Sequence, residues 1–444
     1  MSAAPAEHVL STVHHRPTGR TWPRALAALQ VHDYRLYLSS QMVATTGIWM
    51  QRIAQDWLVL QLTGSVTAVG VAVALQFLPV LLFGLYGGVV ADRYPKRTIL
   101  IITQSTAALM ALSLGILALT GTVQAWHVYL IATLLGFVTV VDNPTRQVFV
   151  SELVGAEHIR NAVSLNSSVF QLGALVGPAA SGLLINAVGQ GWSFLINCTS
   201  CLVVVTMVAV IKPKHASATG ARRQPRKGEL RDGLRYIKAT SEVGWSIVLA
   251  GTIGVFGLNM PVILAAFADH VFTAGVGGYS LFNSLTAVGA LTGAILSARR
   301  RSSPRLRALT TSLVCLGLVL MLASMAPDAY LFGAVLIVAG FCTLQFLTGA
   351  NSLVQTTATP AVRGRVMSVY LLVLLGGQAI GGPSVGWLID HVGARPSMFV
   401  CGALVALVAA GAGLAMARRS HLTLGVTVRP GTGRLPVHIV PSHH

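Results

Sequence analysis

The sequence predicts an all-α polytopic membrane protein with twelve transmembrane helices in two pseudo-symmetric six-helix bundles. Of its 444 residues, 54% are hydrophobic and only 10% are charged, whereas soluble domains carry roughly 25% charged residues. Apolar runs long enough to cross a bilayer recur along the chain, and the second half repeats glycine positions of the first. These observations indicate a duplicated helical bundle built for a membrane.

The apolar runs define the expected spans and domains. Each reaches the roughly 20 residues that a helix needs to cross the hydrocarbon core. They cover residues 37–62, 67–91, 98–120, 126–147, 162–188, 192–211, 245–268, 276–298, 307–326, 329–354, 366–390 and 397–417. The predicted parts are an N-terminal segment (1–36), an N-terminal bundle (37–211), a basic linker (212–243), a C-terminal bundle (244–418) and a tail (419–444). Residues Glu229 to Thr240 of the linker are expected to form an amphipathic helix on the lipid surface.

Positive charge is concentrated at one end of these spans. All of the 31 Lys and Arg residues except Arg52 and Arg395 fall in the terminal segments, the linker, or the connections 2–3, 4–5, 8–9 and 10–11. Because cytoplasmic loops are enriched in Lys and Arg, both termini are predicted to be cytoplasmic, with the spans in the cytoplasmic (inner) membrane. The net charge of +18 would then face anionic lipid, and no nucleic-acid partner is expected.

Two helix pairs repeat at one offset. Helix 2 carries Gly70, Phe77, Gly84 and Gly88, and helix 8 carries Gly275, Phe282, Gly289 and Gly293, each 205 residues later. Helix 5 carries Gly173, Gly177, Pro178 and Gly182, and helix 11 carries Gly377, Gly381, Gly382 and Pro383, at an offset of 204 for the paired glycines. A six-helix unit has therefore been duplicated, and these small residues are expected to pack helices closely.

The connection between helices 2 and 3 carries a recognisable motif. Its sequence, Gly88-Val-Val-Ala-Asp92-Arg93-Tyr-Pro-Lys96-Arg97, resembles the G-x-x-x-D-R-x-G-R-[RK] signature of the major facilitator superfamily. The resemblance covers roughly residues 33 to 418 and implies the fold of that superfamily. It also implies that Gly88 packs helix 2 against helix 11, and that Asp92 and the basic residues form a cytoplasmic latch between the halves.

The same resemblance suggests partners for the latch. Asp92 is expected to meet the positive end of helix 11, near Arg365 to Ser368. Arg97 is expected to pair with Asp142, which ends helix 4 in the stretch "VVDNPTRQ" together with Arg146. Such a latch would hold one conformation and release in the other.

The sequence departs from the superfamily pattern in three places. Pro95 replaces a glycine, Ser297 stands in the second half where the first has Asp92, and residues 126–141 lack the arginine that many drug–proton antiporters carry in helix 4. Helix 5 is similar to the antiporter signature, although packing and a proline kink also explain it. The stretches "QRIAQDWLVLQLTGS", "DNPTRQ" and "RGRVMSVY" look most like the enterobactin-exporter-like branch.

Helix 1 contains a polar cluster in an otherwise apolar run. Its members are Gln51, Arg52, Gln55 and Asp56. Arg52 and Asp56 are spaced i, i+4, so they share a helix face and are able to pair. We interpret helix 1 as lining the central cavity, where Arg52 attracts an anionic group or keeps Asp56 ionised, and Asp56 exchanges a proton. The alternative is a permanent salt bridge that only stabilises the span.

Other polar residues are weaker candidates. The mid-span amides Asn259 and Gln345 are candidates for the substrate pathway, as are Asn166, Gln171, Asn283, Asn351 and Gln378, although most such amides bond between helices. Asp269 and Asp390 are expected to be solvated near the outer face. No metal-ligand spacing, phosphate-binding loop or nucleophile motif occurs, so neither an enzyme nor a bound cofactor or metal is predicted.

The preferred function is secondary active transport, with proton-coupled efflux of a small organic molecule such as a drug, siderophore or metabolite. The expected partners are this substrate, protons and the lipid bilayer, and the protein is expected to be a monomer. Two alternatives remain open: an uncoupled uniporter or importer, and a transport-inactive membrane sensor or scaffold.

Overall fold

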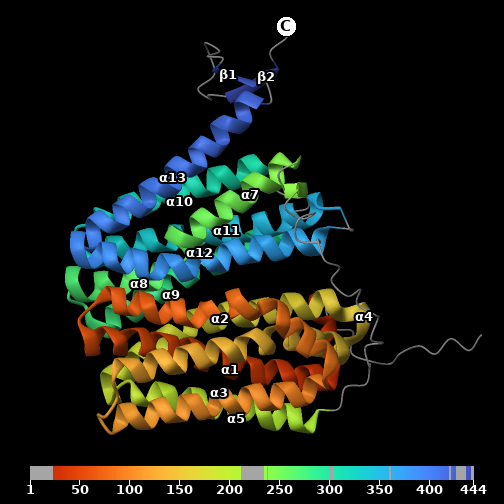
Figure 1. Ribbon diagram of the computed structural model, residues 1–444, viewed down its shortest axis with the longest axis vertical. Helices are drawn as coiled ribbons and strands as arrows, with labels where there is room; N and C mark the ends of the chain where they lie inside the picture. The colour runs from red at the N-terminus through yellow and green to blue at the C-terminus, as the bar shows by residue number, and fades with distance from the viewer. Residues whose placement is uncertain are drawn as a thin grey trace, which may run out of the picture.

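The protein is described by a computed structural model, shown in Figure 1. It describes residues 24–211, 235–237, 239–299, 305–359, 362–419, 422–426 and 437–441. Most of the predicted N-terminal segment and linker lies outside these residues. So does most of the predicted amphipathic helix, of which residues 235–237 and 239 are helical.

The N-terminal half forms one helical bundle, at the bottom of Figure 1. A short 3-10 helix, η1 (Arg24–Gln30), precedes it. The bundle consists of α1 (His32–Thr63), α2 (Val66–Arg93), α3 (Lys96–Leu119), α4 (Ala125–Val188) and α5 (Gly191–Val210). Helix α4 contains two spans, Ala125–Gly155 and Glu157–Val188. The backbone breaks at Gly155, whose φ of +70° favours glycine.

The C-terminal half forms the second bundle, at the top of Figure 1. Its first span, Ser241–Val271, is composed of α7 (Ser241–Thr252), η2 (Ile253–Gly257), α8 (Met260–Ala266) and η3 (Phe267–Val271). The segments η2 and η3 are π-helical, so the continuous helix predicted at 245–268 is interrupted. The remaining helices are α9 (Gly275–Arg299), α10 (Leu306–Ser324), α11 (Ala329–Thr357), α12 (Arg363–Val392) and α13 (Ala394–Arg419).

A hairpin follows α13, which the sequence analysis did not predict. Strands β1 (Leu422–Val426) and β2 (Val437–Pro441) pair antiparallel, with Leu422 opposite Pro441. Both strands are rich in Val, Leu and Ile, which favour extended structure. Figure 1 shows the hairpin beyond the end of α13, outside both bundles.

The helix count agrees with a membrane fold. Among the described residues, eleven helical segments are long and apolar enough to cross a membrane. Helix α1 is long enough, with 32 residues, but its polar cluster lowers its hydropathy. Exposed apolar side chains such as Leu183, Val210 and Ile380 fit helices that face lipid tails. The predicted all-α fold of two six-helix bundles is confirmed.

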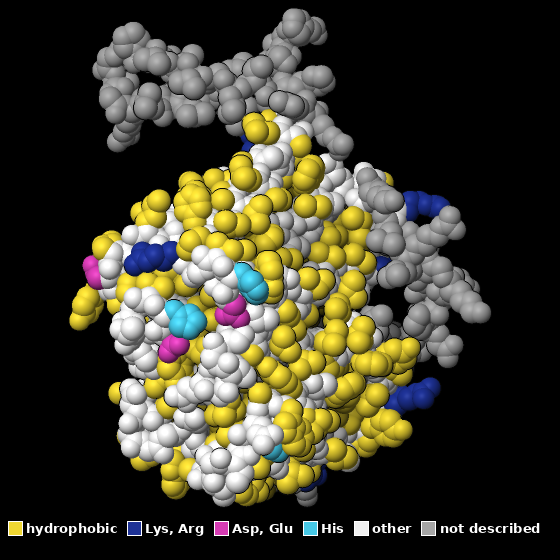
Figure 2. All heavy atoms as spheres, turned by 60° about the vertical axis from the view of Figure 1, so that its left-hand side comes forward, with side chains coloured by type: hydrophobic (Ala, Val, Ile, Leu, Met, Phe, Trp, Pro, Cys, Tyr) yellow, Lys and Arg dark blue, Asp and Glu magenta, His cyan; other side chains and the backbone are white. Residues whose placement is uncertain are grey.

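The helices place the charges as the sequence predicted. The α2–α3 connection, the break in α4 and the starts of α1 and α12 share one end of the molecule, on the right of Figure 1, which we call the basic end. The α1–α2, α3–α4 and α12–α13 connections lie at the other end, which we call the charge-poor end. Figure 2 turns the charge-poor end toward the viewer and shows a surface of hydrophobic and uncharged groups with few acidic, His and basic side chains.

Equivalent glycine contacts occur within each bundle, and they explain the duplicated spacing of the glycines. A Cβ on Gly173 or Gly177 would collide with Thr45 or Trp49 of α1. In the second bundle, a Cβ on Gly381 would collide with the backbone of η2, and a Cβ on Gly377 would lie about 3.1 Å from the backbone of Gly251 and Val255. Helix α4 therefore packs on α1 as α12 packs on the first span of the C-terminal bundle, with close backbone approach in both.

Candidate functional site

Two helix pairs join the bundles. Helix α2 packs on α12, where a Cβ on Gly70 would overlap the carbonyl of Gly382 and a Cβ on Gly386 would lie 2.7 Å from Thr67 Cα. The second span of α4 packs on α9, where a Cβ on Gly182 would lie 2.5 Å from Ser280 Cβ. These contacts all lie in the charge-poor half of the molecule.

The same helices have room at the basic end. A Cβ on Gly88 of α2 or on Gly364 of α12 would have no neighbour within 4 Å. The expectation that Gly88 packs α2 against α12 is therefore wrong for this conformation. The neighbouring Gly87 makes the close contact instead, against the carbonyl of Val140 in α4. The bundles are thus closed at the charge-poor end and have open space beside Gly88 and Gly364.

Asp56 links the bundles inside the protein. Its carboxylate accepts a hydrogen bond of 2.9 Å from the hydroxyl of Tyr279 in α9. Both residues are buried, with Asp56 7% exposed and Tyr279 fully enclosed. The Tyr279 ring also stacks on Trp57, with ring centroids 6.0 Å apart. A titratable group from α1 therefore takes part directly in the contact that closes the charge-poor end.

Arg52 lies one turn from Asp56 toward the basic end but does not pair with it. Within the described ranges, no oxygen of Asp56 comes within the 4.0 Å of Arg52 that an ion pair requires. The Arg52 guanidinium carbon instead lies 5.0 Å from the centre of the Trp49 ring. The alternative of a permanent Arg52–Asp56 salt bridge therefore does not hold in this conformation, because the carboxylate bonds Tyr279 and the guanidinium lies over the Trp49 ring.

Two donors beside this position have no partner among the described residues. Arg52 Nε and Trp49 Nε1 are both buried and donate no bond to any described group. Arg52 and Asp56 share a face of α1, and that face meets the other bundle at Tyr279. Arg52 and Trp49 therefore lie just below the closed contact, on the side where the bundles have room.

The two glutamines of helix 1 occupy different surroundings from Arg52. Gln51 is 4% exposed and accepts a bond of 2.5 Å from Asn197 of α5, so it connects helices within the N-terminal bundle. Gln55 is also buried, at 3% exposed. Of the predicted cluster, Arg52 and Asp56 face the second bundle, whereas Gln51 does not.

The candidate amides of the second bundle are also buried. Asn259 donates to the carbonyls of Gly254 and Val255 where η2 meets α8, and its Oδ1 has no partner among the described groups. Gln345 accepts a bond of 2.8 Å from Ser297 of α9. Both therefore contact their own bundle in this conformation.

The predicted gate residues form a buried cluster within the N-terminal bundle. Asp142 pairs with Arg146 one turn further on, and accepts bonds from Thr103 (2.7 Å) and Gln104 (3.0 Å) of α3. Arg146 also bonds Gln41 of α1. This cluster connects α1, α3 and α4.

Arg97 does not pair with Asp142, contrary to the prediction. It donates to the carbonyls of Val208 and Ala209 near the C-terminus of α5, where a positive charge is favourable. Lys96 lies 4.0 Å from Glu152 of α4. Asp142 is 7% exposed, and the local donors Arg146, Thr103 and Gln104 satisfy it without Arg97.

Asp390 is a residue whose role the sequence analysis missed. It was expected to be solvated, and it is exposed, but it also accepts four hydrogen bonds from the start of α2 across the bundle interface. The repeat offers a signal, because Asp390 of "WLIDHVG" corresponds to Asn186 of "LLINAVG". Asn186 occupies the equivalent place, 3.0 Å from the position of a Cβ on Gly277 in α9.

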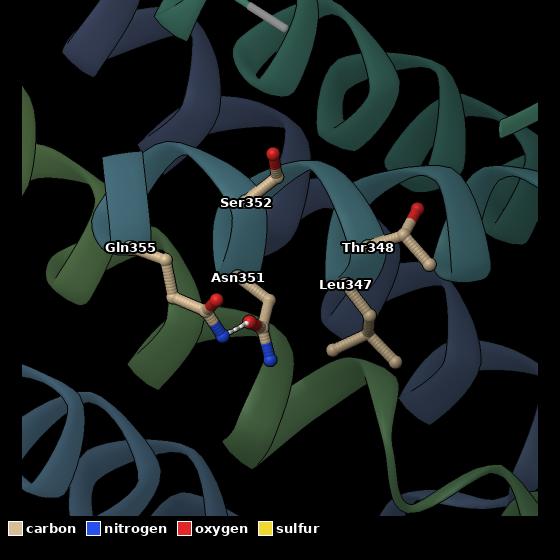
Figure 3. A pocket seen from close by; sticks show the side chains of 5 residues that line it. All are labelled: Leu347, Thr348, Asn351, Ser352 and Gln355. Atoms are coloured by element: carbon tan, nitrogen blue, oxygen red, sulfur yellow. Dashed lines mark hydrogen bonds between the residues drawn. The ribbon is translucent and has the colours of Figure 1, made fainter. Parts of the chain in front are cut away.

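A shallow, open pocket lies along one face of α11 toward the basic end, and Figure 3 shows its lining. Its volume is about 440 Å³. The lining residues are Leu347, Thr348, Asn351, Ser352 and Gln355. The amides of Asn351 and Gln355 point the same way and bond one another. Asn351 was among the weaker candidates, and the pocket gives it polar neighbours at helical spacing.

Comparison with solved structures shows the fold. The nucleoside transporter NupG matches with a TM-score of 0.67 at 12% identity, covering 86% of this chain and 99% of that one. A D-xylose–proton symporter matches with a TM-score of 0.66 at 14% identity, covering 86% and 97%. A POT family transporter matches with a TM-score of 0.70 at 13% identity, covering 87% and 96%.

Comparison with sequences shows the family. Enterobactin exporters EntS of Shigella boydii serotype 18 and of Escherichia coli strain SMS-3-5 are each 24% identical over 376 residues, covering 83% of this chain and 88% of the relative. The sequence model described as transmembrane secretion effector matches residues 24–423. The expected resemblance is confirmed: the chain belongs to the transmembrane secretion effector family of major facilitator transporters, and so to transporters of small molecules rather than to enzymes.

Proposed function

We propose that this protein is a proton-coupled exporter of a small organic molecule, working as a monomer in the cytoplasmic membrane with both termini inside. The charge distribution supports that orientation, because the basic end then faces the cytoplasm. The exporter names of its relatives support the direction of transport. With the charge-poor end closed and the basic end open beside Gly88 and Gly364, the conformation is one that takes up substrate from the cytoplasm.

The observation that carries this proposal is the Asp56–Tyr279 hydrogen bond between the bundles. An ionised carboxylate accepts a stronger hydrogen bond than a neutral one. Protonation of Asp56 therefore weakens the contact that closes the charge-poor end. By linkage, the carboxyl takes up a proton when that end is open and releases it when the end closes. Proton exchange and alternating access are thus coupled at one residue.

Arg52 and Trp49 give the substrate its first contacts in this mechanism. Their unpartnered Nε and Nε1 groups are buried donors, and a buried donor without a partner costs free energy that a ligand oxygen recovers. Arg52 lies one turn from Asp56 on the same face of α1. A substrate held there is close enough to influence whether Asp56 carries its proton. The pocket of α11 is a second contact on the path from the cytoplasm.

The proposal is tested with purified protein in liposomes that enclose a pH-sensitive dye. Counterflow of a panel of small solutes, beginning with enterobactin, first identifies a transported probe. Transport of that probe by the unaltered protein should change the internal pH, whereas Asp56→Asn should exchange the probe without a pH response. Asp269→Asn is the control, because Asp269 is an exposed acid at the same end. Gradient-driven accumulation by Asp56→Asn at the normal level would remove Asp56 from the coupling.

The same measurements separate the alternatives. Exchange by the unaltered protein with no pH response would indicate an uncoupled transporter. No flux of any solute, with the protein folded, would favour a sensor or scaffold.

A further inference from the structure

Helices α2 and α12 each carry a carboxylate close to their last residue, and that of α12 lies beside the start of α2. They run antiparallel along the bundle interface, as Figure 1 shows. Asp92 is the next-to-last residue of α2, and Asp390 lies two residues before the end of α12. The sequence analysis expects Asp92 to meet the start of α12 at the basic end. The structure shows the corresponding contact at the charge-poor end, between Asp390 and the start of α2.

Asp390 uses both carboxylate oxygens in this contact. Its Oδ1 accepts from the backbone N–H of Val66 at 2.9 Å. Its Oδ2 accepts from the hydroxyls of Ser65 (2.6 Å) and Thr67 (2.7 Å) and from the backbone N–H of Thr67 (3.0 Å). The first N–H groups of a helix lack partners within it and carry partial positive charge. A carboxylate of the other bundle therefore completes the cap of α2.

We propose that Asp390 is the outer latch of the transport cycle, holding the charge-poor end closed by capping α2 from the opposite bundle. The contact exists only while α2 and α12 touch at this end. Opening the end removes Asp390 from the helix start and exposes the N–H groups of Val66 and Thr67 again. Asp390 therefore stabilises the inward-open conformation selectively, which is what a latch must do to bias a two-state equilibrium.

The second helix pair lacks this charge. Asn186 of α4 occupies the position related to Asp390 by the repeat, beside Gly277 at the start of α9. An amide is neutral, so it gains less from a helix N-terminus than a carboxylate does. The outer closure is thus asymmetric, with the charged latch at the α2–α12 pair and a neutral contact at the α4–α9 pair.

The test measures how often the charge-poor end is open. Spin labels replace Thr122, in the α3–α4 connection, and Tyr330, which starts α11 and is 90% exposed, in a background without the five native cysteines. Electron–electron distance measurements on the protein in lipid, without substrate or proton gradient, give the ratio of open to closed molecules. Asp390→Asn should raise that ratio at least tenfold, because it removes the charge and leaves one acceptor oxygen.

Asp269→Asn is the matched control, since Asp269 is an exposed acid at the same end that contacts His270 of its own segment. A ratio for Asp390→Asn equal to that of the control would overturn the proposal. If Asp390→Asn does not fold, Thr67→Val removes one donor and keeps the charge, and should raise the ratio about threefold. An unchanged ratio for Thr67→Val in that case would equally overturn it. Because no solute is present, this test stands apart from that of proton-coupled efflux.

Discussion

At the scale of single residues, the N-terminal bundle contains a buried ion pair with a full set of partners. Asp142 is held by Arg146, Thr103 and Gln104, and Arg146 also reaches Gln41. Removing one member of a buried pair leaves the other charge without compensation, and this costs more than the pair itself contributes. The cluster therefore holds α1, α3 and α4 in register, so that α1 presents Arg52 and Asp56 to the second bundle.

Asp142→Ala should lower the free energy of unfolding by about 3–5 kcal/mol, because it leaves Arg146 buried without its carboxylate. Thermal unfolding of the purified protein in detergent measures this as a lower Tm. The double variant Asp142→Ala/Arg146→Leu should recover much of the loss, since it removes the uncompensated charge as well. A double variant less stable than Asp142→Ala alone would show that Arg146 is held mainly by Gln41.

The residues of helix 1 show what sequence reasoning does and does not reach. The polar cluster stands out because a charge within a span is costly and is retained for a reason. Spacing alone suggested that Asp56 pairs with Arg52, but its partner is Tyr279, which is 223 residues away in the chain. Local periodicity fixes which residues share a face of a helix. It does not determine which residue of another helix packs against that face. The contact of Asp390 with the start of α2 was missed for the same reason.

At the scale of helices, glycine positions decide how closely the elements approach. Gly381 lies where α12 crosses η2, and a Cβ there would overlap the carbonyl of Val255. Gly411 of α13 has no atom within 4 Å of the same hypothetical Cβ. Alanine substitutions at these two positions of the C-terminal bundle therefore separate the effect of close packing on stability from the effect of helix propensity.

Gly381→Ala should destabilise the protein by about 1–3 kcal/mol, because the added methyl forces α12 away from η2. Gly411→Ala should leave stability unchanged or raise it by up to about 1 kcal/mol, because alanine favours helix more than glycine. Thermal unfolding of both variants in the same detergent checks the difference. Equal losses of thermal stability in the two variants would contradict the explanation that Gly381 avoids crowding between α12 and η2.

The elements themselves were largely predictable. Eleven of the twelve expected spans meet the length and hydropathy of a membrane helix, because apolar length is a direct requirement of the bilayer. The interruption of the first C-terminal span by η2 and η3 was not expected. A π-helical turn depends on which backbone groups find partners in the packed bundle. The hairpin after α13 likewise depends on contacts that apolar length does not encode.

At the scale of the whole molecule, the repeat and the charge distribution predicted two bundles, and the resemblance of the Gly88–Arg97 motif predicted their family. A duplicated unit must bury the same faces twice, so glycines recur at the same helix crossings in both halves. What the sequence could not predict is the conformation. The spacing of glycines within each bundle is the same whether the charge-poor end is closed or open. The contacts between the bundles, those of Asp56 and Asp390 among them, distinguish the two states.

The account depends on one claim, that the bundles rock so that one end opens as the other closes. Two pairs of spin labels test it directly, with Tyr94 and Gly364 labelled at the basic end and Thr122 and Tyr330 at the charge-poor end. Gly364 accepts a label because no atom lies within 4 Å of a Cβ there. On adding a solute that passes the counterflow assay, the basic-end distance should shorten and the charge-poor distance should lengthen in the same fraction of molecules. Distances that lengthen together, or that stay fixed while transport proceeds, would contradict alternating access by these two bundles.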